Sequence, residues 1–167
     1  MQNHQRDTLA SGYLTFLVFI AYGGDEAKRV AEDLGTYLEK NGISTFVASS
    51  GFGRWLIPGQ PKFDQVIWNK LQKSDIMVLV SSRKTVYSKK VKEEVLETVL
   101  SDKPILVVNE KNTKIPFSKK LRESHWIPED LCFSTTSPAR IFPRVAIEIL
   151  RNMEQWAEDK LTLEETK

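Results

Sequence analysis

The sequence predicts an α/β domain with an open, five-stranded parallel sheet and helices on both of its faces. Apolar, strand-like runs alternate regularly with amphipathic, helix-like runs along the chain, a pattern typical of parallel strands joined by right-handed helical crossovers. Ile76–Val80 (IMVLV) is apolar throughout, as expected of a central strand that helices cover on both faces. The length of 167 residues and the ordinary content of apolar and charged residues fit one globular domain.

The first half of the chain contains two predicted strands and two predicted helices. Leu14–Ala21 is rich in Phe, Val and Ile and predicts a buried strand. Asp25–Lys40 places its apolar residues at helical spacing, and Gly42 ends this helix because glycine adopts the left-handed conformation at low cost. Ile43–Ala48 predicts the second strand, and Lys62–Lys73 predicts the next helix.

A long loop, Ser49–Pro61 (SSGFGRWLIPGQP), separates those last two elements, because its closely spaced Gly and Pro residues exclude a regular element. Loops of this length in compact domains often have a function. Ligands of open parallel sheets bind beyond the carboxyl ends of the strands. We therefore expect this loop to converge on one site with Ala21–Glu26, Ser81–Ser88 and the residues after Val108.

The second half of the chain continues the alternation. Tyr87–Leu100 predicts a helix, Pro104–Val108 a fourth strand and Leu131–Ser134 a short fifth strand. Residues 109–130 have the weakest pattern, and we expect them to hold a short helix near Phe117–Glu123 and then a loop.

The last predicted helix is Ser137–Trp156, with Ser137 as its N-cap and Pro138 directly behind it. Pro143 allows a later start, because proline is tolerated only in the first turn of a helix. The predicted organisation is a polar N-terminal tail over residues 1–12, a domain over residues 13–156 and a charged C-terminal tail over residues 157–167.

Composition and charge exclude several classes of function. The net charge of +2 gives a weak overall field, so we expect neither nucleic acid nor an anionic membrane surface as a partner. The longest apolar run, Tyr13–Tyr22, is only half as long as the roughly 20 residues that a spanning helix needs. Cys132 is the single cysteine, which indicates a reducing compartment, most simply the cytosol. Its apolar neighbours predict an inert, buried thiol.

Several kinds of chemistry are also excluded by what the sequence lacks. Neither a GxxxxGK[ST] nor a GxGxxG motif is present, so the usual phosphate-binding loops are not supported. One cysteine and two histidines cannot form a Cys/His metal site. We therefore expect no metal and no bound cofactor, and a carboxylate remains as the main catalytic candidate.

The helix Tyr87–Leu100 carries that carboxylate. Its apolar face is expected to be formed by Val91, Val95, Leu96 and Val99. Glu94 flanks this face, whereas the spacing of Glu93 and Glu97 suits a solvent-exposed edge. The alternative interpretation of Glu94 is purely structural: it pairs with Lys90 one turn earlier and stabilises the helix.

A series of motifs between Phe16 and Val108 follows the order and spacing of one known family. The matching stretches are Val18–Tyr22 (VFIAY), Asp25, the pattern of Ala31, Leu34, Leu38, Gly42 and Phe46, Pro58-Gly59, Lys62–Asp75, Ile76–Ser82, Ser88–Glu94 and Pro104–Val108. Together they resemble the TIR (Toll/interleukin-1 receptor) domain. The resemblance implies a flavodoxin-like sheet of the TIR type, in agreement with the fold class above.

The resemblance also assigns a role to Glu94. Ser88 and Glu94 occupy the ends of the family motif S-x-W-C-x-x-E, whose Glu is catalytic in TIR domains that cleave NAD. Breaking the nicotinamide–ribose bond builds positive charge on the sugar, which a carboxylate can stabilise. The chain is accordingly expected to be an NAD glycohydrolase or cyclase, with NAD as substrate rather than cofactor. Glu93 is the alternative if the register slips by one residue.

Further site residues follow from the same resemblance. The residues expected to contact the substrate are Tyr22, Gly23, Asp25, Arg54, Trp55, Ser82, Ser88 and Lys90. Pro58 and Gly59 belong to the loop through which TIR domains associate, so a second copy or another TIR domain is an expected partner. The chain departs from the family where Lys90 replaces the motif's Trp, Val91 replaces its Cys, and Gly23 stands where many NAD-cleaving members carry a basic residue.

These departures leave two other functions open. The first is a non-catalytic TIR adaptor that signals by pairing with other TIR domains. The second is an enzyme similar to nucleoside deoxyribosyltransferases, which also place a Glu beside a glycosidic bond and with which Gly23-Gly24 after the first strand is compatible.

Overall fold

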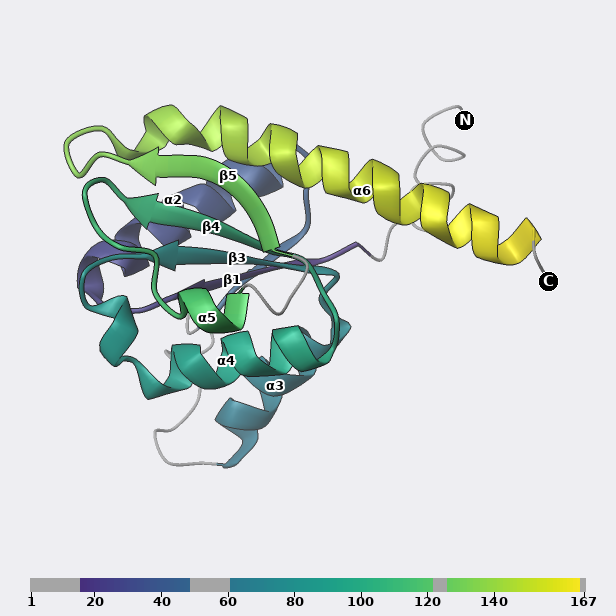
Figure 1. The fold of residues 1–167 in the computed structure, drawn as a ribbon, viewed down its shortest axis with the longest axis horizontal. Helices are drawn as coiled ribbons and strands as arrows, with labels where there is room; N and C mark the ends of the chain where they lie inside the picture. Colours follow the sequence, from purple (N-terminus) through teal and green to yellow (C-terminus); the bar gives the residue numbers. More distant parts are fainter. Residues whose placement is uncertain (1–15, 49–60, 122–125, 166–167) are drawn as a thin grey trace.

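The five strands among the described residues form one parallel sheet in the order β2-β1-β3-β4-β5. The computed structural model describes residues 16–48, 61–121 and 126–165. Helices cover both faces of the sheet (Figure 1), so the predicted fold class is confirmed.

The elements alternate along the chain as predicted. The strands are β1 (Val18–Tyr22), β2 (Thr45–Val47), β3 (Ile76–Ser81), β4 (Ile105–Glu110) and β5 (Trp126–Phe133). The helices are α2 (Asp25–Lys40), α3 (Pro61–Lys73), α4 (Lys89–Leu100), α5 (Ser118–Leu121) and α6 (Phe142–Glu165). Short 3₁₀ turns, Thr85–Tyr87 and Pro138–Ile141, precede α4 and α6.

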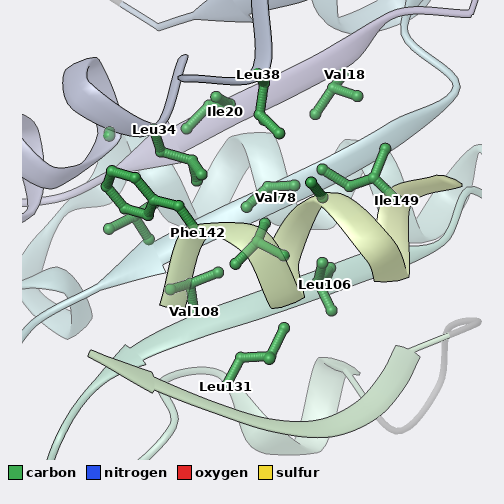
Figure 2. Close-up of a cluster of buried hydrophobic side chains, with 14 of the residues drawn as sticks. Val18, Ile20, Leu34, Leu38, Val78, Leu106, Val108, Leu131, Phe142 and Ile149 are labelled. Carbon is green, nitrogen blue, oxygen red and sulfur yellow. The ribbon is translucent and has the colours of Figure 1, made fainter. Parts of the chain in front are cut away.

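Two hydrophobic cores lie on opposite faces of the sheet. Val18 and Ile20 of β1 face the core under α2 and α6, whereas Phe19 and Ala21 face the core under α3, α4 and α5, because side chains alternate along a strand. Figure 2 shows the first core, with Leu34 of α2 and the helix α6 packed over the strands. β3 is buried along its whole length, as the apolar sequence predicts for a central strand.

At the C-terminal end of the chain, the predicted start of β5 was wrong, whereas α6 starts at the later position that Pro143 allows. β5 begins at Trp126, not at Leu131, and the register shift opposite Leu106 and Val108 lets it contain the polar stretch that hid it. α6 begins at Phe142 after a 3₁₀ turn, so Pro143 lies in its first turn, where a missing N–H breaks no helical bond.

The C-terminal helix is longer than the sequence predicts. Residues 157–165, expected to form a charged tail, continue α6 as far as Glu165. Figure 1 shows this part of α6 projecting past the sheet. Most residues from 157 to 165 are charged or polar, so the sequence shows no apolar helical pattern there.

Two side chains are more exposed than predicted. Cys132 is exposed rather than buried, because β5 is an edge strand and this residue points out of the core. Leu96 of α4 is 40% exposed, so Val91 and Val95 form the buried stripe of that helix with little help from it. The predicted short helix near Phe117–Glu123 is present as α5.

Predictions for residues 1–12 and 49–60 concern segments outside the described residues. Within the part of the chain that is described, no helix has the length and apolar character that a membrane span requires.

Candidate functional site

The carboxyl ends of β1 and β3 lie side by side, since Tyr22 pairs with Val80 in the ladder. The turn that leaves β1, Gly23-Gly24, therefore meets the turn that leaves β3 and leads into α4. Parallel sheets bind ligands at this edge. These two segments thus converge as the sequence predicts.

A hydrogen-bonded clamp joins the two turns. The hydroxyls of Ser82 and Thr85 both donate to the carbonyl oxygen of Gly23, at 3.1 and 3.0 Å. The Thr85 hydroxyl oxygen also accepts from the Ser82 backbone N–H at 2.7 Å. Both side chains are buried, so these bonds are shielded from water.

Gly23 and Gly24 are required by this close approach. A Cβ on Gly23 would lie 2.9 Å from the Thr85 Cα and 3.3 Å from the Ser88 Cβ. Gly24, the N-cap of α2, has a φ of +93°, which side chains rarely adopt. A side chain at position 23, where the family resemblance points to a missing basic residue, would therefore require the turn or the backbone at Thr85 to shift.

α4 starts immediately after the clamp. Its N-cap is Ser88, whose side-chain oxygen accepts from the Val91 N–H at 3.3 Å. Ser88 and Glu94 are six residues apart, which places them about 9 Å apart along the helix axis.

Glu94 is almost completely buried on the inner face of α4, with 3% of its surface exposed. Its Oε2 atom has no hydrogen-bond partner among the described residues. Burial raises the pKa of this carboxyl group to about 7; the positive charge of Lys90 opposes the rise and the negative charge of Glu93 adds slightly to it. Near neutral pH the group can therefore exist in either protonation state.

The structure also distinguishes the two neighbouring carboxylates. Glu93 is exposed and Glu94 is buried, although both were candidates from the sequence. Lys90 is exposed, and its charge influences the Glu94 carboxyl through space.

Not all of the predicted substrate contacts lie together. Gly23, Ser82 and Ser88 meet at the clamp. Asp25 is exposed at the start of α2. Tyr22 packs against the core under α2 and α6, on the opposite face of the sheet from α4. Four more predicted residues lie outside the described part of the chain: Arg54, Trp55, Pro58 and Gly59.

Sequence reasoning missed Thr85, which is fully buried and central to the clamp. A single threonine in a polar loop gives no signal of this kind. It also missed the buried hydrogen bond from Ser81 to Asn109, which joins the carboxyl ends of β3 and β4. Among the described residues, no group of three potential metal ligands lies together.

The sequence that forms this candidate site was compared with known protein families. The model of the TIR domain matches residues 18–135, which is well over half of the chain. The chain belongs to the TIR domain family. The match includes the clamp, α4 and Glu94, so the motif on α4 lies within the TIR domain proper.

Solved structures resemble this TIR domain at low sequence identity. A flavodoxin from the domain Archaea is 14% identical, with a TM-score of 0.54 over 83% of this chain and 99% of its own, and it supports the flavodoxin-like fold. A sugar isomerase domain of an RpiR transcription factor from Sphaerobacter thermophilus is 16% identical, with a TM-score of 0.43 over 98% of this chain and 85% of its own. No curated protein matches the sequence significantly.

Proposed function

We propose that this TIR domain cleaves NAD at the nicotinamide–ribose bond and that Glu94 is its catalytic carboxylate. The observation that carries the proposal is the unpaired Oε2 of Glu94, the one buried side-chain oxygen or nitrogen without a partner in the described residues. Buried acceptors are normally paired within the protein. An acceptor left unpaired at the position of the family's motif is suited to the hydroxyl groups of a ribose.

The chemistry needs the ionised form of Glu94. When the bond to nicotinamide breaks, its electron pair moves to the ring nitrogen and nicotinamide leaves as a neutral molecule. Positive charge develops on the ribose, and a nearby carboxylate stabilises it most strongly where water is excluded. Attack by water completes a glycohydrolase reaction, and attack by a group of the same nucleotide completes a cyclase reaction. NAD is the substrate and is consumed in both cases, and neither reaction requires a cofactor.

The pH dependence of the reaction follows from the raised pKa of Glu94. Because that pKa is about 7, the ionised fraction should rise roughly tenfold between about pH 6 and pH 8. The rate of nicotinamide release should rise in the same proportion. A rate that is constant over this range would contradict a catalytic role for ionised Glu94.

The decisive experiment measures nicotinamide released from NAD by chromatography, at high protein concentration. Glu94→Gln should lower the rate at least about 100-fold, whereas Glu93→Gln should retain it because Glu93 is exposed. Equal rates for wild type and Glu94→Gln would refute the proposal. Base exchange on a deoxynucleoside, assayed in parallel, tests the deoxyribosyltransferase-like alternative.

One observation favours a second function, that of a non-catalytic adaptor that pairs with other TIR domains or with a second copy. The close contact between Gly23 and Thr85 leaves no room for a nucleotide-binding basic side chain. For an adaptor we expect concentration-dependent self-association in sedimentation experiments, lost in Pro58→Ala or Trp55→Ala, and no release of nicotinamide. Activity together with association would instead indicate an enzyme that assembly switches on.

A further inference from the structure

We propose that Thr85 is a positioning residue, whose hydroxyl fixes α4, and with it Glu94, against the turn that leaves β1. The proposal rests on the proposed function, because positioning matters only if Glu94 acts on a substrate bound at this edge. Thr85 itself is fully buried and does not face solvent.

The hydrogen bonds of Thr85 connect two walls of the site. Its hydroxyl donates to Gly23 on one side and accepts from the Ser82 N–H on the other. Its carbonyl oxygen accepts from the Ser88 N–H at 3.0 Å. Thr85 thus contacts both the turn after β1 and the N-cap from which α4 starts.

α4 transmits the position of this cap to Glu94. A helix is stiff over the six residues from Ser88 to Glu94, so a displacement of the cap displaces the carboxylate with it. Catalytic groups must lie within a fraction of an ångström of their productive position, and an error of about 1 Å can cost about 100-fold in rate.

A hydroxyl is needed at position 85, and good packing alone is not sufficient. Valine has nearly the same shape as threonine, yet it can neither donate to Gly23 nor accept from Ser82. The buried Ser82 N–H would then lose its 2.7 Å partner, and a buried donor without a partner destabilises the arrangement that leaves it unpaired. The two turns would move to satisfy this group, and α4 would move with them.

The test compares Thr85→Val and Thr85→Ser with a matched control, Ser74→Ala. The Ser74 hydroxyl is also buried, and it donates to the Leu71 carbonyl oxygen at 2.6 Å. Ser74 lies just before β3, at the amino ends of the strands and so away from the candidate site. Steady-state kinetics of nicotinamide release should show kcat lowered at least about tenfold in Thr85→Val, with KM changed by less than about twofold. Thr85→Ser and Ser74→Ala should retain the wild-type kcat.

A second measurement does not depend on activity. In protein labelled with ¹³C at the glutamate carboxyl groups, NMR follows the titration of Glu94, whose pKa burial raises to about 7. In Thr85→Val the displaced helix should admit water, and the titration midpoint should fall by at least about one unit. Thr85→Ser and Ser74→Ala should keep the wild-type midpoint.

The outcomes separate the two proposals. If wild type releases no nicotinamide, the proposed function fails, and the titration still decides whether Thr85 holds Glu94 in place. An unchanged midpoint in Thr85→Val, or an equal loss of kcat in Ser74→Ala, would overturn the positioning role. Thr85→Ala removes the hydroxyl without adding bulk, so the same measurements can be made if Thr85→Val does not fold.

Discussion

Replacement of Glu94 by glutamine should stabilise the folded protein by about 3 kcal/mol at about pH 8.5 and leave its stability nearly unchanged below about pH 4.5. The reason is the burial of this carboxyl group, which raises its pKa from 4.5 to about 7. Glutamine has nearly the same shape and carries no charge, so it avoids the cost of a buried, unpaired carboxylate.

The direction of the effect follows from proton binding. Between pH 4.5 and about 7, the unfolded chain has lost the Glu94 proton while the folded protein still holds it. The folded state therefore binds more protons, and its stability falls as the pH rises through this range. Below pH 4.5 the free energy of unfolding carries no penalty from Glu94, because the group is protonated in both states. Above about pH 7 the full penalty of the buried, ionised carboxylate lowers the stability.

Urea denaturation at about pH 4.5 and about pH 8.5 measures this difference directly. Glu93→Gln is the matched control: it removes the same charge from an exposed position on the same helix, and Glu93 makes only the smallest contribution to the pKa of Glu94. A pH-independent difference between Glu94→Gln and wild type would show that the carboxyl group is hydrated. A stabilised but inactive variant would mean that the protein gives up stability to keep a functional carboxylate.

Substitution of Gly23 by alanine should destabilise the protein by about 2–3 kcal/mol, because overpacking a rigid site has a cost of this size. The new Cβ would lie 2.9 Å from the Thr85 Cα, a backbone atom that cannot rotate away. The turn after β1 would have to separate from Thr85, and the hydrogen bonds to the Gly23 carbonyl would lengthen or break.

Gly42→Ala is the control for this prediction. Gly42 has a φ of +80°, but nothing lies within 4 Å of the place that a Cβ would occupy there, so only backbone strain of about 1 kcal/mol is expected. Denaturant unfolding compares the two variants under the same conditions. If Gly23→Ala loses no more stability than Gly42→Ala, then the clamp yields easily and cannot position α4.

The contact at Gly23 also explains a departure from the family. A basic residue cannot be restored at this position without a shift of the backbone, because its Cβ alone would lie 2.9 Å from the Thr85 Cα. The glycine and the buried threonine thus depend on each other, although 62 residues separate them in the sequence.

Much of the fold could be predicted from the sequence because burial in a parallel sheet leaves a strong pattern. The apolar run in β3 and the helical spacing in α2 gave both elements close to their observed bounds. β5 could not be found in the same way, since it contains Pro128 and two acidic residues and its register is interrupted. Edge strands tolerate such residues, and their patterns are correspondingly weak.

For the candidate site, the sequence could indicate only the helix α4 and the carboxyl ends of the strands. Glycine after β1 and the Ser–Glu spacing on α4 indicated which segments to consider. Tyr22 was expected at the site because it ends the strand motif, yet it packs on the other face of the sheet, together with Val18 and Ile20. The alternation of side chains along β1 places it there.

The sequence by itself determined the α/β class, the order of the elements and the short list of carboxylates on α4, because hydrophobic spacing and residue type depend on local sequence. The tertiary structure decided that Glu94 is buried with an unpaired oxygen while Glu93 is exposed. It also decided that Thr85 joins Gly23 to the start of α4. Burial and hydrogen bonding between distant segments depend on how helices and strands pack, and neighbours along the chain do not encode them.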